Sequence, residues 1–350
     1  MIRRSTLYRT GLDAIRASGV DRLLAPALRG LGVIFMLHHV LPATAAKRGF
    51  APNAELEVTP EFLDAVIGHM SRKGYRLASL DEAVEVVKRG RVEQPVAVFT
   101  LDDGYRDNYV HAWPVFRAHG CPFTIFVAPA ITDGISELWW KTLEHVVARS
   151  AAVDSRNLLA GEVIRLSSDA DRHAAWQRLY RAMRALDPQS QARAIRALAI
   201  AHGVDTGLLC RSLAMDWNDI RTLARDPLCS IGAHTVHHFA LAKLDAGDAM
   251  QEAVASRDRI AAEIGRRPTT FAYPYGDASS CGPRDFRLIA NAGFAAAVTT
   301  RKGLLKAHHA SGLTALPRLS LNGSLQELRQ IETLLSGLPF SLWNLVTSSE

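Results

Sequence analysis

Short apolar runs that alternate with longer helical patterns constrain the fold of this chain more than any other feature. Each run has the length of a strand, and most are separated by segments with helical spacing. Parallel strands joined by helical crossovers produce this alternation, so the sequence predicts a parallel α/β architecture. The predicted strands are residues 32–37, 76–78, 96–101, 123–128, 229–233, 269–272 and 295–299.

Helix starts and one long interruption organise the rest of the chain. Thr59 precedes Pro60 and Ser79 precedes Leu80-Asp81-Glu82, which are typical N-terminal caps. Residues 136–215 show helical patterns without a convincing strand, so they predict an inserted helical subdomain. Residues 1–30 predict a basic amphipathic helix, 31–322 the main domain, and 323–350 an amphipathic helix with an apolar tail.

The distribution of charge along the chain bears on what the protein could bind. The net charge of +6 is spread along 350 residues rather than gathered in one patch, which argues against a nucleic-acid-binding protein. The first 30 residues are an exception, with six arginines against Asp13 and Asp21. This segment is either a helix packed on the domain, the simpler interpretation, or a helix on an anionic membrane surface.

Cysteine spacing and the termini bear on location. Cys121, Cys210, Cys229 and Cys281 are far apart, so we expect buried, reduced thiols. No apolar segment follows the first arginines, and no stretch is long enough to span a membrane. These features predict a cytoplasmic protein and leave open a contact with the inner membrane face. The oligomeric state is not predicted.

Two carboxylates follow a predicted buried strand. Residues 96–101 run directly into Asp102-Asp103-Gly104. Adjacent side chains leaving a strand point in different directions, so one carboxylate could bind a metal while the other faces a substrate. Aspartates before a glycine are also common in plain turns.

Histidines follow another predicted strand in the same way. Residues 229–233 lead into His234-Thr235-Val236-His237-His238. Two imidazoles four residues apart share a face if the segment is helical, and with a carboxylate they suit a divalent metal. We expect Zn²⁺ ahead of other first-row transition metals. A solvated histidine loop is the alternative.

Two further strand ends carry candidate residues. The segment Phe271-Ala272-Tyr273-Pro274-Tyr275-Gly276 predicts a tight turn that aims the Tyr275 N–H into a site, while Tyr273, Pro274 and Tyr275 could contact a sugar. His38 follows the first strand and could serve as a general acid. Alone, the Tyr273–Gly276 segment is more simply a plain turn, and His38 is equally compatible with a structural histidine.

Together these motifs resemble the polysaccharide deacetylase family, the carbohydrate esterases with a NodB homology domain, over residues 33–320. The Thr100–Gly104 segment is similar to the family's T-F-D-D-G motif, which implies Asp102 as catalytic base and Asp103 as metal ligand. The His234–His238 segment is similar to H-[ST]-x-x-H, which implies its outer histidines as the other ligands. The resemblance also implies a distorted β/α barrel of about seven parallel strands.

Other family motifs depart from the usual pattern. Ala272 stands where many members have an arginine, which leaves unassigned the group that orients Asp102. A subgroup with F-A-Y-P-Y-G is similar to this chain. The usual C-terminal L-x-x-H is absent from residues 316–319, but Leu37-His38-His39-Val40 is similar to an early Y-H-x-V segment that implies His38 as the acid.

The resemblance implies a hydrolase of carbon–nitrogen bonds other than peptide bonds. It would remove N-acetyl or other N-acyl groups from an amino-sugar oligosaccharide, polysaccharide or lipid-linked sugar, with a metal-activated water as nucleophile. Two alternatives remain: a deformylase or small-molecule amidohydrolase on the same scaffold, and an inactive sugar-binding protein.

Overall fold

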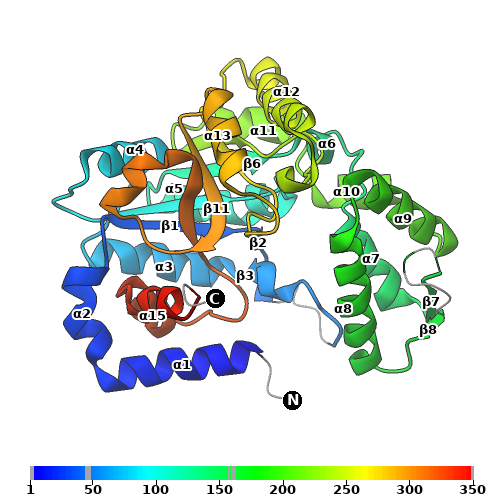
Figure 1. Ribbon diagram of the computed structural model, residues 1–350, viewed down its shortest axis with the longest axis horizontal. Helices are drawn as coiled ribbons and strands as arrows, with labels where there is room; N and C mark the ends of the chain where they lie inside the picture. The colour runs from blue at the N-terminus through cyan, green and yellow to red at the C-terminus, as the bar shows by residue number, and fades with distance from the viewer. Residues whose placement is uncertain (1–3, 44–48, 157, 159–162, 348–350) are drawn as a thin grey trace.

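Seven parallel strands form a closed barrel in this protein. The computed structural model describes residues 4–43, 49–156, 158 and 163–347 (Figure 1). The ring runs in the order β1-β12-β11-β10-β9-β6-β5, and pairing of β1 with β5 closes it. Its strands are β1 (Gly32–Leu37), β5 (Val96–Leu101), β6 (Phe123–Val127), β9 (Cys229–Ala233), β10 (Thr270–Ala272), β11 (Ala296–Lys302) and β12 (Leu316–Ser320). The predicted barrel is confirmed.

The membership of the barrel differs from the prediction at two strands. β4 (Arg76–Leu77) was predicted correctly as a strand, but it pairs with β5 outside the ring. β12, which completes the ring, was missed because Pro317 and Arg318 interrupt its apolar run. A proline cannot donate a ladder hydrogen bond, and the β11–β12 pairing is accordingly irregular there.

Helices cover the outside of the barrel, and their starts carry the predicted caps. The Thr59 hydroxyl accepts a hydrogen bond from the Phe62 N–H, and Ser79 forms a capping box with Glu82. The covering helices are α3 (Pro60–Arg72), α4 (Leu80–Arg89), α5 (Trp113–Ala118), α11 (Trp217–Ala224), α12 (Ala246–Ile264) and α13 (Pro283–Asn291).

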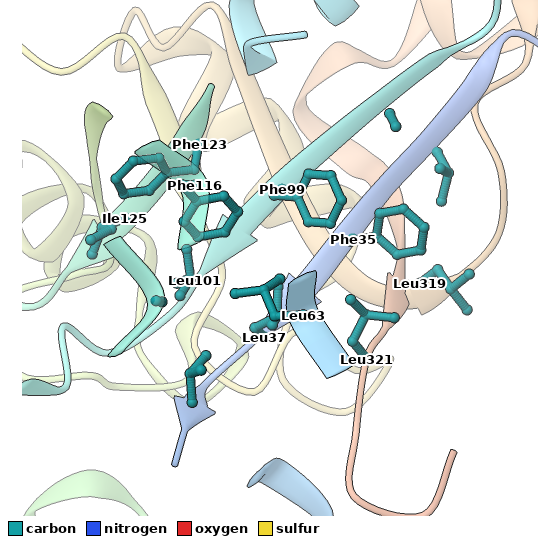
Figure 2. Close-up of a cluster of buried hydrophobic side chains, with 14 of the residues drawn as sticks. Phe35, Leu37, Leu63, Phe99, Leu101, Phe116, Phe123, Ile125, Leu319 and Leu321 are labelled. Carbon is teal, nitrogen blue, oxygen red and sulfur yellow. The ribbon is translucent and has the colours of Figure 1, made fainter. Parts of the chain in front are cut away.

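The strands are buried on both faces, as barrel strands must be. Phe35, Phe99 and Leu319 point outward and pack with Leu63 of α3 (Figure 2). Residues of opposite parity, such as Ile34 and Val98, join a second cluster with Phe126 inside the barrel and with residues of α4. Neither apolar cluster includes Asp102, Asp103 or the histidines that follow the carboxyl end of β9.

The predicted insertion forms a separate helical lobe, on the right in Figure 1. It has its own apolar cluster, which includes Leu143, Leu179 and Ile195. The expectation of no strand was wrong, because an antiparallel hairpin of two three-residue strands lies within it. Such short, partly exposed strands leave no apolar run in the sequence. The elements of the lobe are α7 (Trp139–Arg149), β7 (Ala152–Asp154), β8 (Val163–Arg165), α8 (Asp169–Ala185), α9 (Pro188–Ala201) and α10 (Thr206–Leu213), and α6 (Pro129–Thr132) lies just before it.

The two ends of the chain pack together beneath the barrel (Figure 1). The predicted N-terminal helix is two helices, α1 (Arg4–Ser18) and α2 (Val20–Leu28), separated at Gly19 with a φ of 70°. The C-terminal segment forms α14 (Leu328–Leu335) and α15 (Leu338–Thr347). Arg9 and Arg16 of α1 form ion pairs of 2.6 and 2.7 Å with Glu327 and Glu332, so this part of the basic helix packs on the domain. Among the described residues, none of the helices combines the length and apolar character needed to cross a membrane.

Candidate metal centre and active site

The carboxyl ends of β5 and β9 bring together three potential metal ligands. Asp103 Oδ1 lies 3.3 Å from His234 Nε2 and 3.1 Å from His238 Nε2. One ligand atom from each residue lies within 4.8 Å of the others, and all three side chains are buried. The structure therefore places the three predicted ligands close enough to share one ion, since metal–ligand bonds are about 2 Å long.

Unusual backbone conformations create this convergence. Among the described residues, five non-glycine residues have positive φ, and four of them are Asp103, Thr235, His238 and Tyr275 at this site. The segment after β9 is not helical, because residues 234–240 form an irregular loop. The two histidines meet instead through left-handed residues, a costly conformation that tends to occur at functional sites.

The donor set fits a divalent metal. His234 Nδ1 lies 2.7 Å from the Ala272 carbonyl oxygen, which leaves Nε2 facing Asp103, an arrangement typical of metal-binding histidines. Asp103 Oδ1 is buried without a hydrogen-bond partner in the part of the chain that the structure describes. Burial raises the pKa of Asp103, but the adjacent imidazoles outweigh it and hold that pKa well below its usual value. A buried, ionised carboxylate oxygen beside two imidazoles is a suitable site for a borderline cation such as Zn²⁺.

Asp102, the predicted base, is held by an arginine that the sequence analysis missed. Arg318 of β12 donates two hydrogen bonds to its carboxylate, of 2.7 and 2.6 Å, and is completely buried. Arg318 also donates to the Thr100 hydroxyl and the Thr299 carbonyl, so its side chain is fixed. Burial raises the pKa of Asp102, but Arg318 outweighs burial and lowers it below its usual value. An arginine inside an apolar strand was the signal available in the sequence.

The adjacent histidines after β1 have different environments. His38 Nε2 lies 4.0 Å from Asp102 Oδ2, so the structure brings this predicted residue to the site. Burial is the main cause of a lowered pKa at His38, although both aspartates act in the opposite direction. His39 points elsewhere: its Nδ1 lies 2.6 Å from Asp107, and its ring stacks on Tyr105 at 3.7 Å between centroids.

Two tryptophans at the start of α7 cover the candidate metal centre. The Trp140 ring lies 4.8 Å from that of His238, and its Nε1 donates a 2.9 Å hydrogen bond to the Tyr105 hydroxyl. Trp139 Nε1 donates to the Tyr275 hydroxyl at 2.8 Å. The insertion is therefore part of the site, a role that sequence reasoning did not predict.

The turn after β10 separates the predicted sugar contacts. Tyr275 reaches the site, with its ring 4.8 Å from that of His238, and no described residue accepts a hydrogen bond from its backbone N–H. Tyr273 instead is 1% exposed and packs in the core, where its hydroxyl donates to the Thr314 carbonyl. Pro274 is buried between them. The structure therefore brings Tyr275, and not Tyr273, to the predicted site.

Comparisons with known proteins agree with the resemblance found in the motifs. The family model described as polysaccharide deacetylase matches residues 160–292, a range that includes His234 and His238 but not the two aspartates. No curated protein matches the chain in sequence.

Several solved structures share the fold. Streptococcus pyogenes deacetylase PplD in complex with acetate is 16% identical with a TM-score of 0.56, covering 87% of this chain and 97% of its own. IcaB from Ammonifex degensii is 18% identical with a TM-score of 0.54, covering 88% and 98%. A de-N-acetylase from Aggregatibacter actinomycetemcomitans is 14% identical with a TM-score of 0.55, covering 86% and 98%. The predicted resemblance and barrel are confirmed.

Proposed function

We propose that this relative of the polysaccharide deacetylases is a metal-dependent hydrolase that removes N-acyl groups, chiefly acetyl, from an amino-sugar-containing carbohydrate. Its family acts on carbon–nitrogen bonds other than peptide bonds, in agreement with the enzyme class predicted from the sequence. The observation that carries the proposal is the convergence of Asp103, His234 and His238 beside Asp102, which Arg318 keeps ionised.

The chain supplies a base, an oxyanion donor and a proton path. A divalent metal held by Asp103, His234 and His238 would polarise the acyl carbonyl and lower the pKa of a bound water. Asp102 is ionised and oriented, so it can accept the proton of the attacking water. The Tyr275 N–H has no acceptor among the described residues and would stabilise the developing oxyanion.

The departing amine needs a proton, and His38 is the candidate donor. Because burial lowers its pKa, His38 is neutral in the free site at pH 7. The proton taken up by Asp102 is therefore the one available to the amine. His38 Nε2, 4.0 Å from Asp102, is positioned to pass it on.

Two aspartate substitutions test this assignment. Asp102→Asn keeps the shape of the side chain but removes the base, so turnover should fall by about 10²–10⁴-fold with metal content near one ion per chain. Asp103→Asn removes a charged ligand, so metal content and turnover should fall together. The reverse pattern would exchange the two roles. Unchanged hydrolysis in both variants would refute the proposed active site.

The acyl group and the sugar are tested with a substrate panel. Release of acetate and formate should be measured from N-acetylated and N-formylated sugars, with and without Zn²⁺. Acetate release would support the proposal, whereas preferential formate release would favour the deformylase alternative. The absence of an arginine at Ala272 is the main argument for an inactive sugar-binding protein. The pairing of Arg318 with Asp102 from another strand argues against that alternative.

A further inference from the structure

A large groove lies between the terminal helices and the end of β12. Its volume is 930 Å³, within the range of small-molecule sites. Leu12 and Ile15 of α1 form one wall, and Leu342 and Trp343 of α15 form another. Leu342 and Trp343 are 45% and 55% exposed, so apolar surface remains open to solvent at this groove. Exposed apolar surface of this kind marks an interaction site.

Two neighbouring strands, β1 and β12, connect the lining of the groove with the candidate active site. Ser320 lines the groove and follows Arg318, the partner of Asp102, by two residues on β12. Ser320 pairs with Met36 of β1, which precedes His38 by two residues. A ligand in the groove could therefore extend to the same end of the barrel as the reacting sugar.

Lys302, at the end of β11, is a cation that lines this groove. Lys302 Nζ lies 4.8 Å from the ring centre of Tyr8 and 5.5 Å from that of Trp343. Within the described part of the chain, no hydrogen bond or ion pair joins Lys302 to a carboxylate, although Glu55 also lines the groove. Arg9 and Arg16 of α1, in contrast, form ion pairs with Glu327, which precedes α14, and with Glu332 of α14. Lys302 is exposed to solvent at the end of β11. An exposed cation beside an apolar groove is complementary to an anion attached to a hydrocarbon chain.

We propose that this groove binds the hydrocarbon chain of a phosphate-bearing lipid that carries the amino sugar, with the phosphate near Lys302. The inference rests on the proposed function, because it makes the substrate a lipid-linked sugar. The apolar walls hold the chain, and the sugar reaches the barrel end where Asp102 lies. A hydrocarbon in this position also explains why Leu342 and Trp343 remain exposed.

Direct binding tests the groove without any catalysis. Farnesyl phosphate is titrated into the full-length protein by calorimetry, with farnesol and inorganic phosphate as separate probes. Lys302→Met and Leu342→Glu should each weaken farnesyl phosphate binding by at least about tenfold, the usual effect of losing one charge-assisted or apolar contact. Leu208→Glu is the matched control, since Leu208 is 61% exposed on α10 outside the groove. Both groove variants should keep the wild-type melting temperature.

Several outcomes would overturn the proposal. These are no binding of farnesyl phosphate, equal losses in Leu342→Glu and Leu208→Glu, or inorganic phosphate alone binding as tightly. A wild-type dimer that Leu342→Glu converts to a monomer in light scattering would identify a second copy as the occupant.

A second measurement separates this inference from the proposed function. Leu342→Glu should retain deacetylation of a water-soluble N-acetylglucosamine oligosaccharide but lose activity on a prenyl-phosphate-linked substrate. Asp102→Asn should lose both activities and still bind farnesyl phosphate. Retained activity of Leu342→Glu on the lipid-linked substrate would refute the groove while leaving the active site intact.

Discussion

At the scale of single residues, the buried pair of Asp102 and Arg318 decides what the site can do. A guanidinium presents parallel N–H groups that match both oxygens of a carboxylate, so the pair fixes orientation as well as charge. Removing one partner from a buried ion pair leaves an uncompensated charge, which typically costs about 3–5 kcal/mol. The same contact therefore affects stability and the protonation state of the proposed base.

Substitution of Arg318 should separate these two effects. Arg318→Lys keeps the charge but loses the forked geometry, so we expect turnover to fall by at least about tenfold with metal content unchanged. Arg318→Met should also lower the free energy of unfolding by about 3–5 kcal/mol, because Asp102 stays buried and unpaired. Turnover, metal content and urea unfolding measure the three quantities. Wild-type turnover in both variants would show that Arg318 does not position the base.

At the scale of elements, apolar patterning predicted those parts of the fold that form continuous buried runs. β1, β5 and β9 were predicted to the residue because every position in them is apolar or small. β12 was missed because its central residues are Pro317 and Arg318, whose roles depend on partners in other strands. Sequence spacing could not show that residues 234–240 would form a loop, since left-handed residues leave no apolar signal.

The contact between the helical insertion and the site could not be predicted from local sequence patterns. Its helices were predicted, but their contact with the site depends on how Trp139 and Trp140 pack against Tyr275 and His238. A pair of tryptophans at the start of a helix is more often part of a core. Long-range packing of this kind cannot be predicted from helical spacing alone.

Helix α7 should therefore matter for catalysis as well as for stability. Trp140→Phe keeps an aromatic ring beside His238 but removes the N–H that holds the Tyr105 hydroxyl. We expect Trp140→Phe to lower kcat/KM by about tenfold, the effect of one hydrogen bond to a buried group. Trp140→Ala should in addition lower the free energy of unfolding by about 3–5 kcal/mol. Trp176→Phe, on helix α8 of the same lobe, is the control and should retain kcat/KM; an equal loss there would assign the effect to the lobe as a whole.

At the scale of the whole molecule, α1 and α14 join the two ends of the chain to the barrel. Glu332 of α14 lies 2.7 Å from Arg16 of α1 and 2.9 Å from Lys73 after α3, so one carboxylate joins α14 to two other segments. Burial raises the pKa of Glu332, but Lys73 and Arg16 together outweigh burial, so the net shift of the pKa is downward. A group with a lowered folded-state pKa stabilises the fold above its unfolded pKa and loses that contribution as the pH falls through the folded value.

Glu332→Gln should therefore destabilise the protein in a pH-dependent manner. We expect a loss of about 0.5–1 kcal/mol near pH 7, because these ion pairs are partly exposed. The difference from wild type should shrink as the pH falls below about 4, where the unfolded carboxyl is protonated. Urea unfolding at both pH values measures it. Glu85→Gln, at an exposed pair within α4, should change stability much less; a pH-independent loss in Glu332→Gln would exclude the ion pairs as its cause.

Metal binding should stabilise the whole barrel, because the proposed ligands join the ends of two strands. Asp103 follows β5 and the histidines follow β9, and β6 lies between these strands in the sheet. Three of the residues at this site, Asp103, Thr235 and His238, have left-handed backbone conformations that are costly without compensating contacts.

The native geometry of Asp103, His234 and His238 is absent from the unfolded chain, so a metal should bind the folded state preferentially. At a free Zn²⁺ concentration 100 times its Kd, the gain in folding free energy is about 2.7 kcal/mol. We therefore expect Zn²⁺ to raise the melting temperature of chelator-treated protein, and Asp102→Asn to show the same rise because Asp102 is not a ligand. His238→Ala should lose most of it, whereas His237→Ala should keep it, since His237 points toward Glu252. An equal rise in melting temperature in His238→Ala and His237→Ala would mean that the metal stabilises the protein by binding at a different site.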